Sequence, residues 1–117
     1  MHEMTYIVPI CNMAIDQAHK NKAKSIKALH IEIGEMTAVV PSIFQSYFKE
    51  ASKNTILEDA KLTLEMIPIT ANCLKCGRIF KPDKINDYCC PSCGNNQSKI
   101  IEGREVILKS IEIEESS

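Results

Sequence analysis

The sequence has 117 residues, 44 % of them hydrophobic, and its 14 Lys and Arg residues nearly balance 15 Asp and Glu residues. The formal charge of −1 gives no overall electrostatic attraction to nucleic acid or to an anionic membrane, and no apolar run reaches the roughly 18–20 residues that would cross a bilayer. The length suits one compact domain with a small appendage, so we expect a folded, soluble, cytoplasmic protein.

The segment from Met4 to about Asn21 has the apolar spacing of an amphipathic helix. Pro9 is comfortable only in the first turn of a helix, so regular helix is expected to begin near Tyr6 or to kink there. Cys11 lies on the apolar face and is expected to be a small core residue. The apolar positions are Ile7, Ile10, Cys11, Ala14, Ile15 and Ala18.

A strand and a second helix follow. Residues Lys27 to Ile33 alternate between apolar and polar, which predicts a half-buried strand that ends at Gly34. Pro41 suits the first turn of an amphipathic helix that runs to about Lys53. The apolar residues of this helix are Ile43, Phe44, Tyr47, Phe48 and Ala51.

Two further strands are predicted on either side of a cysteine-rich segment. Residues Lys61 to Ile67 alternate and are closed by Pro68, with Leu62, Leu64 and Met66 expected on the buried face. The last strand spans roughly Glu105 to Ile113. Its apolar residues change phase after Leu108, which indicates either a bulge or burial on both faces.

The cysteine-rich segment has the spacing of a tetrahedral metal site. It contains the sequences Cys73-Leu74-Lys75-Cys76-Gly77 and Cys90-Pro91-Ser92-Cys93-Gly94, and thirteen residues separate the two pairs. Two residues between the cysteines let one tight turn aim both sulfurs at one ion, and the following glycine can adopt φ > 0. We therefore predict Zn²⁺ at Cys73, Cys76, Cys90 and Cys93. No secretory signal is expected in the first twenty residues, which disfavours two disulfides, while iron or a redox dithiol remain alternatives.

The start of the chain is the second candidate metal site. The bulky His2 is expected to leave Met1 in place with a free amine. The Met1 amine, the deprotonated His2 amide and His2 Nδ1 then form two chelate rings that suit Ni²⁺ or Cu²⁺, and Glu3 can add its amide nitrogen or carboxylate. The simpler alternative is a solvated N-terminal histidine. His19 is expected near the end of a helix, where a cation suits the dipole, and His30 on the polar face of a strand, where it is solvated. Cys89 is expected to be a bystander or a thiol near the metal.

These elements define an α+β fold with an insertion. A small three-stranded sheet packs with two helices, and a four-cysteine zinc-ribbon module is inserted before the last strand. The expected division is an α/β domain of residues 1–69 and 103–117 and a zinc-binding module of residues 70–102. A module of about 30 residues is too small for a hydrophobic core, so it is expected to fold around its ion.

Three motifs together resemble the HypA/HybF family of hydrogenase nickel-incorporation proteins, over essentially the whole chain. They are Met1-His2-Glu3, Ile33-Gly34-Glu35 and the repeated CxxCG. The resemblance implies a nickel metallochaperone, not an enzyme, that delivers Ni(II) during maturation of [NiFe]-hydrogenase and in some organisms urease. It implies nickel at His2, with Met1 and Glu3 as neighbours, and structural Zn(II) at the four cysteines. The implied partners are the nickel-handling GTPase HypB and the hydrogenase large subunit, and the oligomeric state, a homodimer included, stays open.

The alternatives are a zinc-ribbon module for nucleic-acid or protein interaction and an iron-based electron carrier. Between Cys73 and Cys93, four basic residues face two acidic ones, and Phe80 and Tyr88 are the aromatic residues available for base stacking. An electron carrier leaves the α/β domain and His2 without a role. An enzyme of unknown class is a third alternative, but no nucleophile-and-base pair or acid/base dyad can be assembled from the sequence.

Overall fold

The computed structural model describes residues 3–115, and the chain divides into two compact units. The first unit comprises Met1–Glu32, Val39–Glu65 and Val106–Ser117, and the second comprises Ile33–Ala38 and Met66–Glu105. Within residues 3–115, no helix is long and apolar enough to span a bilayer.

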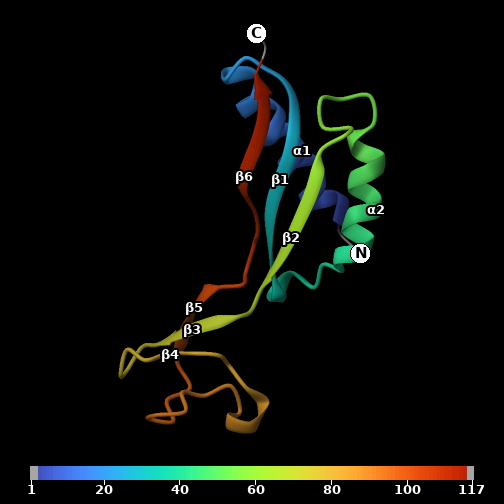
Figure 1. Ribbon diagram of the computed structural model, residues 1–117. Helices are drawn as coiled ribbons and strands as arrows, with labels where there is room; N and C mark the ends of the chain where they lie inside the picture. Colours follow the sequence, from blue (N-terminus) through green and yellow to red (C-terminus); the bar gives the residue numbers. More distant parts are fainter. Residues whose placement is uncertain (1–2, 116–117) are drawn as a thin grey trace. The chain divides into compact units, whose positions relative to one another are not determined.

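Two helices and a three-stranded sheet build the first unit, with the strand order β2-β1-β6 (Figure 1). The helices α1 and α2 contact each other and cover the sheet, so that their apolar faces meet the apolar face of β1 in one core. This arrangement confirms the predicted α+β class. The elements are α1 (Glu3–Lys20), β1 (Ala23–Gly34), α2 (Pro41–Ser52), β2 (Lys61–Ile67) and β6 (Val106–Glu115). The largest core side chains are Ile7, Ile10, Ile26, Leu29, Ile31, Phe44, Phe48 and Leu57.

The first helix begins earlier than its proline suggests. α1 starts at Glu3 and contains Pro9, so the expectation of a start near Tyr6 was wrong. Pro9 and Thr5, one turn earlier, are both exposed. Pro9 has no N–H, so the Thr5 carbonyl oxygen lacks its usual helical hydrogen bond. This carbonyl group lies on the exposed side of the helix, which water reaches. The predicted burial of Cys11 is confirmed.

Fewer apolar residues are buried on α2 and on β2 than their sequence patterns predict. On α2, Phe44, Phe48 and Ser52 are buried at intervals of four residues, whereas Tyr47 is 45 % exposed and Ile43 is exposed as well. On β2, Met66 is 46 % exposed and does not belong to the buried face. Met66 belongs to the second unit, whereas Leu62 and Leu64, which are partly buried, belong to the first.

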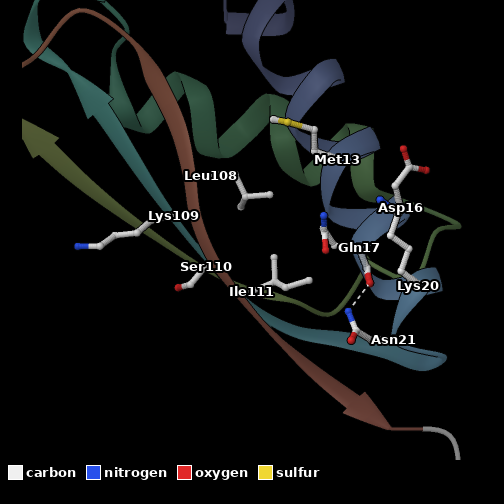
Figure 2. Close-up of a pocket in the computed structure, with 9 residues that line it drawn as sticks. All are labelled: Met13, Asp16, Gln17, Lys20, Asn21, Leu108, Lys109, Ser110 and Ile111. Carbon is white, nitrogen blue, oxygen red and sulfur yellow. Dashed lines mark hydrogen bonds between the residues drawn. The ribbon is translucent and has the colours of Figure 1, made fainter.

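The burial pattern of the last strand favours the predicted bulge over burial on both faces. Val106, Leu108, Ile111 and Ile113 are all partly buried, while the consecutive residues Lys109 and Ser110 are both exposed. Figure 2 shows Leu108 and Ile111 on the side of α1, with Lys109 and Ser110 directed away from it. Two consecutive side chains on one side of a strand indicate an extra residue in the ladder, which disfavours the alternative of burial on both faces.

A smaller three-stranded sheet, with the order β4-β3-β5, organises the second unit (Figure 1). β3 pairs antiparallel with β4, and with β5 in a register that sets Cys73 opposite Ser98. Its buried cluster is small and consists of Ala71, Cys73, Phe80 and Cys90, with Ile100 packed against it. The strands are β3 (Thr70–Cys73), β4 (Ile79–Phe80) and β5 (Ser98–Glu102), and two short 3-10 turns are η1 (Glu35–Thr37) and η2 (Lys84–Asn86).

Candidate metal centre

Two similar turns carry the four cysteines of the second unit. In the first turn, which follows β3, the Gly77 N–H donates to the Cys73 carbonyl oxygen at 3.0 Å. In the second, the Gly94 N–H donates to the Cys90 carbonyl oxygen at 2.9 Å. Gly77 and Gly94 have φ values of +76° and +73°, a region that side chains rarely adopt, which explains why each pair of cysteines is followed by glycine.

The two turns bring the four sulfurs into one cluster. All four Sγ atoms lie within 4.8 Å of one another. Cys73 Sγ lies 3.5 Å from Cys93 Sγ, and Cys76 Sγ lies 3.6 Å from Cys90 Sγ. A disulfide needs about 2.05 Å, whereas four sulfurs at about 2.3 Å from a tetrahedral zinc ion are roughly 3.8 Å apart. The geometry therefore fits a shared metal ion and does not fit two disulfides.

Backbone N–H groups favour thiolates at the first cysteine of each pair. The N–H groups of Cys76 and Lys75 donate to Cys73 Sγ at 3.5 and 3.4 Å and hold the pKa of Cys73 at about 6. In the second turn, the N–H groups of Cys93 and Ser92 lower the pKa of Cys90. Thiolates are the ligand form of cysteine, so both turns prepare one sulfur for a cation.

The second cysteine of the first pair shows the opposite effect. The Arg78 N–H lowers the pKa of Cys76, but the sulfur of Cys90, burial and the sulfur of Cys73 together raise it to about 11. Thiolates this close repel one another, so they share protons until a cation neutralises them. A divalent metal ion supplies that charge, which makes the cluster a binding site whose strength falls as protons compete for sulfur.

Contacts around the cluster connect the two turns. The Arg78 guanidinium in the first turn donates to Ser92 Oγ in the second. Asn95 Nδ2 lies 3.9 Å from Cys73 Sγ and also donates to the Gln97 carbonyl oxygen at 3.2 Å. These residues could not be predicted from the sequence, because side chains such as Arg, Ser and Asn are common in turns and have no spacing that marks them as supports of a metal site.

The two remaining cysteines lie outside the cluster. Cys89 is not among the four clustered thiols, and its Sγ donates to the Asp87 carbonyl oxygen at 3.6 Å. Cys11 is buried in α1, and burial raises the pKa of its thiol. Of the two neighbouring cysteines, Cys90 therefore joins the cluster, as expected from the matched spacing, and Cys89 does not.

This division predicts which thiols react. With zinc bound at neutral pH, Cys89 is expected to be alkylated by iodoacetamide at least about tenfold faster than Cys11, because thiolate character and access both control the rate. Peptide mass spectrometry after short labelling measures each cysteine, and removal of zinc should add the four clustered cysteines to the reactive set. Equal labelling of Cys11 and Cys89 would contradict this assignment.

Of the proposed nickel residues, Met1 and His2 lie outside the described residues, and Glu3 lies inside them. Glu3 is the first residue of α1, is 1 % exposed and accepts a hydrogen bond from the Val40 N–H at 3.5 Å. A hydrogen bond from its own backbone N–H, followed by the Val40 N–H, outweighs burial and lowers the pKa of Glu3. Its carboxylate is therefore ionised and turned inward against the start of α2.

The cluster found among residues 3–115 consists of four cysteines and contains no histidine. His19 is exposed in the last turn of α1. His30 is not simply solvated as expected, because its Nε2 lies 2.9 Å from Glu65 Oε1 on the neighbouring strand. A groove of about 520 Å³ between α1 and β6 also contains no proposed metal residue (Figure 2). Its lining consists of Met13, Asp16, Gln17, Lys20, Asn21 and Leu108 to Ile111.

Known proteins with similar sequences share one description. A family model described as "Hydrogenase/urease nickel incorporation, metallochaperone, hypA" matches residues 1–113. A protein of Aquifex aeolicus called "Hydrogenase maturation factor HypA" is 31 % identical over 114 residues, which cover 97 % of this chain and 98 % of that protein. A protein of the same description from Picosynechococcus sp. is 37 % identical over 116 residues, covering 97 % and 99 %.

Solved structures agree with the sequence comparisons. The solution structure of the Ni metallochaperone HypA from Helicobacter pylori matches with a TM-score of 0.76 and 27 % sequence identity, covering 99 % of this chain and all of that one. A second solution structure, described as HypA protein, matches with a TM-score of 0.77 and 28 % identity over 97 % of this chain. The similarity thus extends over both units and includes the cysteine-rich segment.

Proposed function

Since the chain belongs to the HypA family of hydrogenase and urease nickel-incorporation metallochaperones, we propose that it delivers Ni(II) during maturation of [NiFe]-hydrogenase and holds a structural Zn(II) at Cys73, Cys76, Cys90 and Cys93. Members of this family are maturation factors and not enzymes. The observation that carries the proposal is the family match over residues 1–113, which includes both the start of the chain and the four-cysteine cluster.

The zinc part of the proposal rests on the donor set. Four thiolates close a tetrahedral shell and leave no position for substrate, which is the character of a structural zinc site. Cys73 and Cys90 are each 2 % exposed, so half of the shell is shielded from water. We propose that residues 70–102 act as a zinc-binding module that folds around this ion, inserted into a nickel-binding domain of residues 1–69 and 103–117. The compact second unit is larger than this module, because it also contains residues 33–38, 66–69 and 103–105.

The nickel part rests on the chemistry of the chain's start. We propose that the Met1 amine, the His2 amide nitrogen and His2 Nδ1 hold Ni(II) in two chelate rings. Glu3 would join through its amide nitrogen, because its carboxylate is buried and accepts the Val40 N–H. The amide would then give up the hydrogen bond that its N–H donates to the Glu3 carboxylate. Burial of this carboxylate also supports a fixed position for the first residue of α1, directly after the nickel-binding histidine.

Handover needs partners that accept the metal. We propose that the GTPase HypB and the hydrogenase large subunit exchange nickel with this chain, and that urease is a further recipient in organisms that contain it. A four-thiolate site requires reduced cysteines, which supports a cytoplasmic location for this exchange. Nickel at a terminus can leave when its nitrogen ligands take up protons, whereas zinc in the closed shell stays bound.

The pH dependence of nickel release tests this mechanism. A histidine with a pKa near 6.5 is about 90 % neutral at pH 7.5 and about 90 % protonated at pH 5.5, and only the neutral ring binds metal. A chelator should therefore remove nickel at least about tenfold faster at pH 5.5 than at pH 7.5. Stopped-flow absorbance of the chelator complex measures the rate, and zinc content determined in parallel should stay constant. Equal nickel release at the two pH values would contradict the proposal.

A further inference from the structure

Three separate chain segments meet by backbone contact at one end of the second unit. The Gly34 N–H donates to the Glu105 carbonyl oxygen at 2.9 Å, and the Met36 N–H donates to the Gly103 carbonyl oxygen at 2.9 Å. These bonds join the turn after β1 to the segment after β5. We call this contact of residues 33–36, 68–69 and 103–105 the junction, and all its residues belong to the second unit.

The junction has no room for side chains between its backbones. A Cβ atom on Gly34 would lie 2.4 Å from the carbonyl carbon and oxygen of Gly103. A Cβ atom on Gly103 would lie 2.8 Å from Ile69 Cα and from the Pro68 carbonyl oxygen, and Gly103 also has a φ of +86°. Both glycines are thus required by close approach of the chain, and the three segments stack directly on one another.

One side chain completes the junction. Glu35 Oε1 accepts a hydrogen bond from the Ile69 N–H at 3.2 Å. Glu35 is held on the short turn η1, where Thr37 Oγ1 donates to the Gly34 carbonyl oxygen at 2.7 Å. Pro68 has no N–H, so Ile69 presents the first backbone donor after β2, directly before β3 begins at Thr70.

The junction is connected to the cysteines through short strands. β3 begins one residue after Ile69 and ends at Cys73, and β5 ends one residue before Gly103. The two strands pair antiparallel from Thr70 opposite Glu102 to Cys73 opposite Ser98, with one register shift between Thr70 and Ala71. Fixing Ile69 and Gly103 against Gly34 and Glu35 therefore fixes the start of the β3–β5 pair, which lowers the loop-closure entropy of bringing the four sulfurs together.

We propose that Glu35 is a positioning residue for the cysteine cluster. Together with Gly34 and Gly103, it keeps the junction closed whether or not a metal ion is bound. The metal-free chain then presents Cys73 at the end of a strand that is already placed. The proposed effect on metal exchange rests on the proposed zinc binding at the four cysteines. The closed junction does not depend on zinc binding.

Hydrogen exchange of single amides in the full-length protein tests whether the junction is closed. Glu35→Ala removes the acceptor of the Ile69 N–H and should speed its exchange about fivefold, the effect of losing one hydrogen bond at a partly exposed site. Glu35→Gln keeps an acceptor oxygen and should stay within about twofold of the wild type. Glu102→Ala removes an exposed carboxylate of the same unit and should leave Ile69 unchanged.

Two further measurements separate a positioning role from a purely local one. After zinc removal, the wild-type amides of Gly34, Met36 and Ile69 should keep their exchange rates within about threefold, while those of Gly77 and Gly94 rise at least about a hundredfold. Zinc loss to a chelator should be about fivefold faster in Glu35→Ala than in the wild type or in Glu35→Gln.

The proposal is overturned by an unchanged Ile69 rate in Glu35→Ala, by junction amides that open together with the cysteine turns when zinc is removed, or by equal zinc release in Glu35→Ala and the wild type. Failure of the proposed zinc site is seen separately, as purified protein without zinc. In that case the amide exchange rate of Ile69 in Glu35→Ala still decides whether the junction is closed.

Discussion

Replacing Cys73 by alanine is expected to remove zinc from the cysteine cluster and to unfold the two turns that carry it, while α1, α2 and the sheet β2-β1-β6 stay folded. The apolar cluster of the second unit contains only Ala71, Phe80 and Ile100 besides cysteines, so it cannot hold the turns alone. Structural zinc sites contribute roughly 10–16 kcal/mol of binding free energy, far more than burial of two or three such side chains at about 2 kcal/mol each.

The measurement is metal stoichiometry of the untagged protein together with amide exchange. Loss of one of four thiolates should weaken zinc at least about a thousandfold, so the Cys73→Ala protein should be purified without zinc. The matched control is Cys89→Ala, which removes a thiol one residue from Cys90 but outside the cluster and should keep one zinc ion per chain. A Cys73→Ala protein that retains stoichiometric zinc would show that the cluster is not the zinc site.

Replacing His2 by alanine is expected to abolish nickel binding and to leave both zinc and the fold intact. The change removes the imidazole nitrogen that closes the six-membered chelate ring. The start of α1, from Glu3 to Ile10, contains no histidine or cysteine that could replace it. We expect nickel affinity to fall at least about a hundredfold. Isothermal titration with Ni²⁺ measures the change, and circular dichroism checks that α1 is preserved.

Two controls sharpen this prediction. One added residue before Met1 removes the terminal amine from the chelate and should reproduce the loss without touching His2. His19→Ala removes an exposed imidazole at the other end of the same helix and should leave nickel binding unchanged. If nickel binding survives both His2→Ala and the added residue, the metal is held elsewhere.

The elements of the first unit were predictable because each one buries a single periodic face. The periodicity gave α2 and β2 to within a residue, and Pro41 and Pro68 marked where they start and stop. Four details were not predictable. β1 begins at Ala23, four residues before the predicted start at Lys27, and the alternation does not extend that far back because Ile26 and Leu29 are both buried three residues apart. Tyr47 and Met66 are apolar at positions with the right period, yet both are exposed in the fold. Pro9 lies inside α1, where its side of the helix faces water.

In the second unit, the cysteine cluster was predictable from the sequence, but the sheet β4-β3-β5 was not. The spacing of the cysteines alone brought Cys73, Cys76, Cys90 and Cys93 together, because two matched turns impose the geometry. β3, β4 and β5 have two to five residues, too few for an alternating pattern, and they exist because they pair with one another. The contact between Glu35 and Ile69 joins residues 34 positions apart, and nothing local in the sequence marks it.

The bulge in β6 has a consequence for association. β6 lies at the edge of the sheet β2-β1-β6, so one side of its backbone offers N–H and C=O groups to strands of other molecules. At Lys109 and Ser110 the regular spacing of these groups is interrupted, and the Lys109 side chain is turned to β1, where its Nζ lies 3.4 Å from Glu32 Oε2. A strand of another molecule cannot continue its ladder past this point, so the irregularity protects an open sheet edge from growing into aggregates.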